Sequence, residues 1–223
     1  MNGVFRVYSK DLLPLYLFVC ILFLTGAVFG ALLVDALTPQ QKSEVGQYMR
    51  SFLLEAAAGG PSAESGLKET PSGTGSGSAA VWEAFAAHAR WIFLIWLFGL
   101  SVVGAPAILL LDFLKGVLVG FTVGYLAQTW SWNGVLFALL AVIPQNAVVV
   151  PVLIVASVAA LSFSAAFAGS RLLGRGTLMR APLAAFTATA LFLAFILYAV
   201  SLFEAFVSPQ LLEWAAPIVL EGV

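Results

Sequence analysis

The chain has 223 residues, of which 61% are hydrophobic and only 9% are charged, and its mean hydropathy is +1.02. Soluble domains carry charge on about a quarter of their residues, so this composition excludes an ordinary soluble domain and predicts an all-α polytopic membrane helix bundle. The formal net charge of −1 argues against a nucleic-acid surface. Cys20 is the only cysteine, so we expect no intrachain disulfide and no cysteine metal site.

The first predicted crossing is residues 12–34, an uncharged apolar run that follows Arg6 and Lys10 in residues 1–11. About 20 apolar residues cross the hydrocarbon core, and flanking basic residues favour the cytoplasm. A cleaved signal peptide is the alternative interpretation, with Gly26-Ala27 near a candidate cleavage site. Its apolar core is normally only about 7 to 15 residues long, so we expect an uncleaved anchor and a cytoplasmic N-terminus.

Residues 35–90 are predicted to lie outside the cell as an amphipathic helix and a flexible linker. Thr38-Pro39-Gln40-Gln41 is typical of a helix start with a capping box. Apolar side chains then recur at helical spacing, which makes one face a candidate for docking a partner or for lying on the membrane: Val45, Tyr48, Met49, Phe52 and Leu53. Residues 56–80 are rich in Ala, Gly, Ser and Pro, and we interpret them as the linker.

Two further crossings are predicted within residues 91–128. His88 is the only histidine and has no titratable partner nearby in the sequence, so we interpret it as an interfacial residue rather than a base or a ligand. The turn between the two crossings falls either at Gly104-Ala105-Pro106 or around Asp112 to Lys115, and the sequence leaves both open.

Gly116, Gly120 and Gly124 share one face of the predicted third crossing. Glycines at every fourth residue let a neighbouring backbone approach closely, so they predict a helix-packing seam. The seam joins helices within one subunit or joins this chain to a complex. Asp112 and Lys115 lie three residues apart, so we expect them to pair near a membrane boundary as intramembrane polar residues.

Residues 134–168 are too long for one straight crossing and contain Pro144 and Pro151. We predict a half-helix over 134–143, after an interfacial QTWSWN at 128–133, and then a full fourth crossing from about 147 to 167. The amides of Gln145 and Asn146 can satisfy backbone groups freed at the break, which makes them a candidate intramembrane polar site. A structural kink is the alternative interpretation.

Arg171, Arg175 and Arg180 predict a cytoplasmic loop at residues 169–181. A fifth crossing over 182–204 then places 205–223 outside, with an interfacial helix starting at Ser208-Pro209. The sequence contains no HExxH, GxSxG, Walker or CxxC motif. We therefore predict a protein that is not an enzyme, with no catalytic, cofactor-binding or metal-ligating residues.

Three segments resemble the stage II sporulation protein M family of endospore-forming bacteria. They are GAVFGALLVDALTPQQK, WLFGLSVVGAPAILLLDFLKGVLVGFTVGYL and NGVLFALLAVIPQNAVVVPVLIVASVAALSFS. KGVLVGFTVG, and PQN followed by an aliphatic run, are the most specific parts. Residues 56–80 and the last forty residues carry little of the resemblance.

The resemblance implies a membrane scaffold that acts when the mother cell engulfs the forespore. Such proteins hold two peptidoglycan-degrading partners, stage II sporulation proteins D and P, at the septal membrane. Membrane lipid is the other expected partner, and a homo-oligomer is compatible with the glycine seam. A permease-like protein with a polar site at the broken fourth crossing is the alternative hypothesis.

Overall fold

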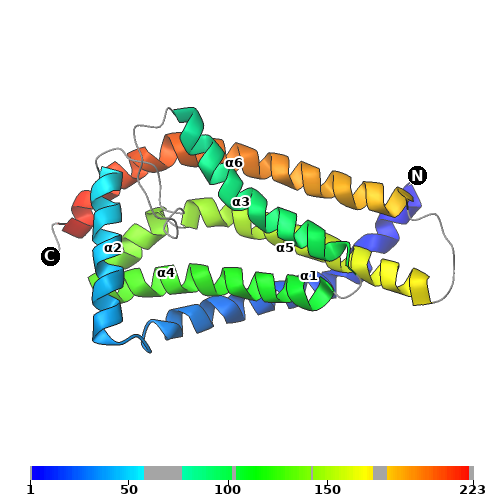
Figure 1. Cartoon of the computed structure of the whole chain (residues 1–223), viewed down its shortest axis with the longest axis horizontal. Coiled ribbons are helices and arrows are strands. Elements are labelled where there is room, and N and C mark those ends of the chain that lie inside the picture. Colours follow the sequence, from blue (N-terminus) through cyan, green and yellow to red (C-terminus); the bar gives the residue numbers. More distant parts are fainter. Residues whose placement is uncertain (1, 58–76, 102–103, 142, 173–179, 221–223) are drawn as a thin grey trace.

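The computed structural model describes the backbone of residues 2–57, 77–101, 104–141, 143–172 and 180–220. Side-chain surroundings are described for 12–48, 81–82, 84–101, 104–129, 135, 146–167 and 182–206. The regular structure of these segments is helical: α1 (Asn2–Leu33), α2 (Pro39–Ala57), α3 (Gly77–Gly99), α4 (Gly104–Ala141), α5 (Ile143–Leu172) and α6 (Arg180–Leu220). All except α2 run along the bundle, whereas α2 stands across one end (Figure 1).

Four segments in the described part are long and apolar enough to cross a membrane: Leu12–Leu33, Gly104–Thr129, Asn146–Phe167 and Pro182–Phe206. The first ends at Leu33, one residue before the end of the predicted crossing at 12–34, and its start at Leu12 is where the described side chains begin. Ala84–Gly99 on α3 is apolar but shorter, about 24 Å at 1.5 Å per residue. Five crossings therefore remain a prediction. The start of α1 and the end of α6 lie at opposite ends of the bundle (Figure 1), as an odd number of crossings requires.

The turn between α3 and α4 lies at the first of the two positions that the sequence left open. The α3 helix ends at Gly99 and α4 begins at Gly104. Between them, the Ser101 amide donates to the Phe98 carbonyl at 2.9 Å and the Gly104 amide to the Ser101 carbonyl at 3.2 Å. Pro106 sits in the first turn of α4, where a missing amide donor costs nothing.

The predicted half-helix at 134–143 is wrong as a separate element. These residues continue α4 to Ala141, and QTWSWN at 128–133 is helical as well. Figure 1 shows α4 bending sharply near α2, so that its last turns lead towards the start of α5. The chain leaves α4 before Pro144, and Pro151 is accommodated inside α5. Inside a bundle, groups on neighbouring helices can satisfy the backbone carbonyl that loses its amide donor to a proline.

The predicted separate helix after Ser208-Pro209 is also wrong. The α6 helix runs without a break to Leu220 and includes both positions. The linker predicted at 56–80 lies mostly outside the described residues, but α3 begins within it, at Gly77.

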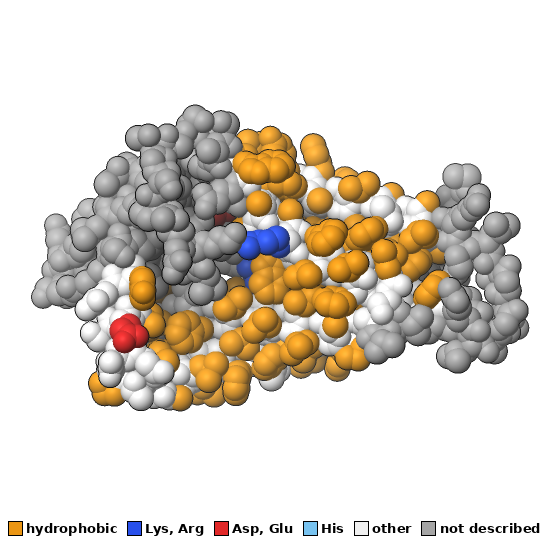
Figure 2. Space-filling view, in the orientation of Figure 1, with side chains coloured by type: hydrophobic (Ala, Val, Ile, Leu, Met, Phe, Trp, Pro, Cys, Tyr) orange, Lys and Arg blue, Asp and Glu red, His pale blue; other side chains and the backbone are white. Residues whose placement is uncertain are grey.

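The core of the bundle is built around α5. Burial covers 56% of its candidate span, against 11% of the span on α1. Val149, Leu153, Val158 and Leu161 of α5 pack with buried residues of α3, α4 and α6. The outward faces of α1 and α6 carry exposed apolar side chains such as Leu17, Ile21, Phe192 and Phe195. Apolar side chains also spread along the described face in Figure 2, as expected of a surface solvated by lipid.

The N-terminus of α2 forms the predicted capping box. The Gln41 amide donates to the Thr38 hydroxyl at 3.4 Å, and the Thr38 amide donates to the Gln41 side-chain oxygen at 3.0 Å. Each bond satisfies an amide that a helix start leaves without a partner.

We expect Thr38→Ala to destabilise the first turn of α2 by about 1 kcal/mol, because the capping hydroxyl is lost. Hydrogen exchange in nanodiscs should show faster exchange at residues 39–42 and unchanged exchange in α5. Thr38→Ser keeps the hydroxyl and is the matched control. Equal exchange in the two variants would show that the cap contributes nothing measurable.

Candidate functional site

The glycines of α4 face α1 across a close backbone contact. A Cβ atom at Gly116 would overlap the Phe23 carbonyl, and one at Gly120 would overlap the Ala27 carbonyl. A Cβ at Gly124 would lie 2.9 Å from the Cα of Ala31. The three glycines therefore bring α4 against successive turns of α1 within one subunit.

The contact is reciprocal, because α1 also has glycines at the same interface. A Cβ at Gly26 would overlap the Phe113 carbonyl, and one at Gly30 would overlap the Val117 carbonyl. Small residues on both helices allow the two backbones to approach and gain van der Waals contact that lipid tails cannot match. We call this interface, formed by Gly26, Gly30, Gly116, Gly120 and Gly124, the glycine seam.

A polar network fixes the first turns of α2 on α4 at Tyr125 and Gln128. The Tyr125 hydroxyl donates to the Lys42 carbonyl at 2.9 Å. The Lys42 ammonium donates to the Gln128 side-chain oxygen at 3.4 Å, and the Gln128 amide donates to Asp35 at 2.8 Å. These contacts place the start of α2 across the end of the bundle.

Of the predicted docking face on α2, Val45 is half-buried and Tyr48 is 78% exposed. The side chains of Met49, Phe52 and Leu53 lie outside the described part. The structure therefore shows where α2 lies, but the docking role of most of its apolar face stays a prediction.

Asp112 and Lys115 are buried inside the bundle, about two turns into α4, rather than near its end. The Ser157 hydroxyl of α5 donates to Asp112 at 2.8 Å. The Lys115 ammonium lies 5.4 Å from the centroid of the Trp91 ring on α3, an arrangement that stabilises a desolvated cation. The expected ion pair between Asp112 and Lys115 is absent from this described region, because the two side chains contact different helices.

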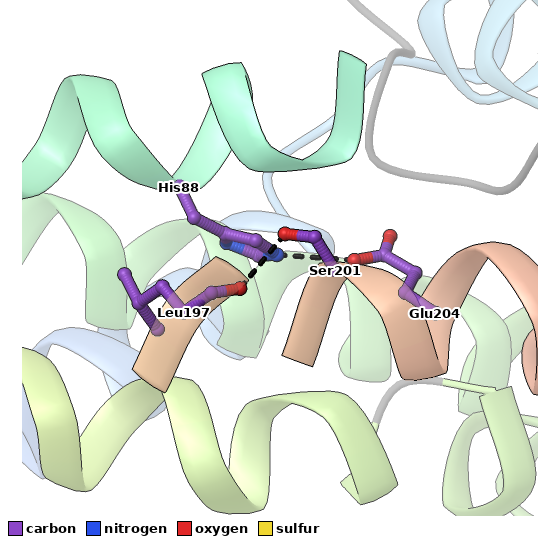
Figure 3. A network of polar contacts seen from close by, with 4 residues as sticks. All are labelled: His88, Leu197, Ser201 and Glu204. Carbon is purple, nitrogen blue, oxygen red and sulfur yellow. Dashed lines mark hydrogen bonds and ion pairs between the residues drawn. The ribbon is translucent and has the colours of Figure 1, made fainter. Parts of the chain in front are cut away.

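His88, interpreted from the sequence as an interfacial residue without a titratable partner, is buried in the bundle and does have such a partner. His88 is 1% exposed, and its Nε2 lies 3.0 Å from Oε2 of Glu204, which is 2% exposed. Figure 3 shows the two side chains meeting between α3 and α6, with Ser201 beside them. The Ser201 hydroxyl donates to the Leu197 carbonyl at 2.9 Å. The partner of His88 lies 116 residues away in the sequence, so a search of its sequence neighbours could not find it.

Asn146 lies in the first turn of α5 and is half-buried, whereas the Gln145 side chain lies outside the described part. Among the positions that the structure describes, no three His, Cys, Asp or Glu side chains are grouped so that they could hold a metal ion.

A match to a known family extends beyond the segments that carry the resemblance. The model of the family described as Stage II sporulation protein M matches residues 19–209. The chain belongs to the stage II sporulation protein M family. No curated protein and no solved structure matches the chain. In this member of the stage II sporulation protein M family, the match covers α2 to α5 in full, the C-terminal part of α1 and most of α6. It includes the glycine seam and the His88–Glu204 contact.

Sequence reasoning missed Glu204, Ser157 and Ser201 in this family member. One signal was available, because Glu204 closes an otherwise uncharged predicted crossing, and an ionisable residue in a span marks a functional or paired position. The two serines gave no such signal, because serine is common in membrane helices.

Proposed function

We propose that the chain is a membrane scaffold that anchors peptidoglycan-degrading partners during forespore engulfment. Membership of the stage II sporulation protein M family supports the sporulation setting. Stage II sporulation proteins D and P are the proposed partners, at the septal membrane. The proposed role requires no catalytic residue and no cofactor.

The observation that carries the scaffold role is the placement of α2. A helix that lies across the end of a bundle presents its side chains outside the span, where a wall-degrading partner can reach them. The capping box and the Tyr125, Lys42 and Gln128 contacts hold its first turns in place. A helix that is already ordered loses less conformational entropy when a partner binds.

We expect replacement of Tyr48, Met49 and Phe52 by serine to weaken partner recruitment at least about tenfold, because removing buried interface anchors typically costs 2 kcal/mol or more. The measurement is co-purification with the two hydrolases and the septal fluorescence of tagged hydrolases. Membrane abundance of the variant should be unchanged.

The matched control replaces three exposed polar residues of the same helix, Gln40, Glu44 and Gln47, by alanine. Its recruitment should resemble the wild type. Normal recruitment by the serine variant would mean that α2 lies on the bilayer and does not dock these partners.

The proposed orientation has α2 and the C-terminal end of α6 outside the cell. Arg6 lies near the start of α1 and Arg180 starts α6, and these two helix starts share one end of the bundle (Figure 1). The positive-inside rule supports a cytoplasmic location for that end.

The orientation can be tested with single cysteines, because Cys20 is the only native cysteine. In a Cys20→Ser background, we expect a membrane-impermeant maleimide to label Gln47→Cys in intact cells. Arg175→Cys should be labelled only after permeabilisation. The reverse labelling pattern would overturn the proposed orientation.

A permease-like function is the second candidate, and the buried ionisable side chains of α3, α4 and α6 favour it, since such residues line many transport pathways. It predicts that Asn146→Ala or Gln145→Ala changes solute flux in vesicles and leaves hydrolase localisation intact. Normal flux with lost localisation would favour the scaffold.

A further inference from the structure

The outward side of α3 carries a charge in the middle of an apolar stretch. Arg90 lies within Ala84–Gly99, six residues after its start and nine before its end. Its side chain is exposed, and among the described residues it makes no ion pair and no side-chain hydrogen bond. The other charged residues of the apolar segments are buried: Asp112, Lys115 and Glu204. Of the charges in these segments, only Arg90 faces outward.

Arg90 lies near the middle of the bundle's length. Its neighbour Trp91 lies under the Lys115 ammonium, 5.4 Å from the ring centroid. Lys115 is 11 residues from the start of the candidate span Gly104–Thr129 and 14 from its end, about 17 and 21 Å at 1.5 Å per residue. Figure 2 shows basic atoms at the surface about midway along the bundle, with apolar side chains beside them. Long basic side chains reach the membrane surface from the ends of a helix, whereas a charge at mid-depth needs a partner or water.

Large apolar side chains share the outward side of α3 with Arg90. Trp82 is 65% exposed, Phe93 is 57% exposed and Leu97 is 45% exposed. Positions 82, 90, 93 and 97 lie on one side of a helix, and we call these four residues the α3 stripe. The opposite side of α3 is buried in the bundle: Val81, His88, Ile92 and Ile95. The stripe is therefore an unpartnered helix face with a cation in its middle.

The anion that matches Arg90 comes from another molecule. A second copy of this chain does not supply it at this depth, because the two acids of the apolar segments, Asp112 and Glu204, are 4% and 2% exposed. Lipid phosphates lie outside a hydrocarbon core about 30 Å thick, so they are remote from a side chain at its middle. A carboxylate on a membrane helix can lie at the same depth as Arg90. Opposite charges across an interface also fix the partner and its register.

We propose that the α3 stripe binds a membrane-spanning helix of another protein, and that this helix carries an aspartate or glutamate at the level of Arg90. The carboxylate pairs with the guanidinium, which suits planar carboxylate recognition. The apolar side chains of the stripe pack against the same helix on either side of the pair. The stripe is a surface separate from the α2 face, so the proposed recruitment of hydrolases through α2 can fail without affecting it.

Site-specific photocrosslinking in the native host identifies what lies against the stripe. The photoreactive amino acid p-benzoylphenylalanine replaces Phe93 in the full chain, and mass spectrometry sequences the crosslinked peptides. The expected adduct contains an apolar membrane segment of another protein with an aspartate or glutamate in it. Its yield should fall at least about tenfold with Arg90→Leu, because removing one partner of a buried charge pair leaves the other unpaired. Arg90→Lys keeps the charge and should keep the adduct.

Four outcomes would overturn the proposal: adducts with lipid alone, adducts with a second copy of this chain, a partner segment without an acid, or a yield that Arg90→Leu leaves unchanged. The matched control places the same photoreactive amino acid at Leu191, which is 67% exposed on the outward face of α6. An adduct there that depended equally on Arg90 would also overturn it, because the effect would not be local to the stripe.

The isolated protein gives a second measurement. Without its partner, the wild type keeps an outward charge in lipid, and Arg90→Leu removes that charge. The thermal midpoint of purified Arg90→Leu in nanodiscs should therefore equal or exceed that of the wild type. A lower midpoint would show that a group of the same chain holds Arg90, and would overturn the proposal.

Discussion

Replacing Gly120 by leucine is expected to separate α1 from α4 and to destabilise the bundle by about 3 kcal/mol or more. Overpacking against adaptable side chains typically costs about 1–3 kcal/mol. Here even a Cβ atom would overlap backbone atoms of Ala27, and backbone cannot move aside without shifting the whole helix. The measurement is the free energy of unfolding in bicelles by steric trapping, together with the thermal midpoint of the purified protein.

Leu118→Phe is the matched control, because it adds bulk on the same helix at an exposed, lipid-facing position. Its stability should stay within about 0.5 kcal/mol of the wild type. If Gly120→Leu were as stable as Leu118→Phe, the close approach of α1 and α4 would be wrong. Loss of hydrolase recruitment in a stable Gly120→Leu protein would instead indicate that the seam also meets a partner.

His88→Ala is expected to destabilise the bundle by about 3–5 kcal/mol, because removing one partner leaves the other group buried and uncompensated. Glu204→Ala should cost less, about 1–3 kcal/mol, since the His88 ring loses one hydrogen bond. Unfolding free energies measured by steric trapping would give both values.

The matched control is the double variant His88→Leu with Glu204→Leu, which removes both polar groups and keeps the site filled. Apolar replacement of a buried ion pair is often neutral or stabilising. The double variant should therefore be more stable than His88→Ala. Additive losses across a His88→Ala and Glu204→Ala cycle would show that the two side chains do not interact.

The approximate positions of the long apolar helices along the chain could be predicted, because the constraint that lipid places on a crossing segment depends on the residues of that segment alone. An uncharged run of sufficient length has to be helical, and the predicted first crossing does lie on α1, which ends at Leu33. The start of α2 was equally predictable, because Thr38 and Gln41 satisfy amides only three residues away.

The positions at which helices begin and end were less predictable, since a proline shows only that one backbone amide donor is missing. At Pro106 it opens α4, and at Pro151 it sits inside α5. Whether a proline starts a helix or lies inside one depends on the residues of other helices that surround it in the bundle. A single sequence does not show which residues those are.

The amino-acid sequence by itself therefore determined the class of the protein, the approximate positions of its long helices, the cap of α2 and the spacing of the α4 glycines, because each depends on residues within a few turns. Only the tertiary structure decided that the glycines face α1, that Asp112 and Lys115 contact different helices and that His88 meets Glu204. Those contacts join residues up to 116 positions apart. They form only in the assembled bundle, because buried polar groups need hydrogen-bond partners and small-residue faces need a neighbouring helix to pack against.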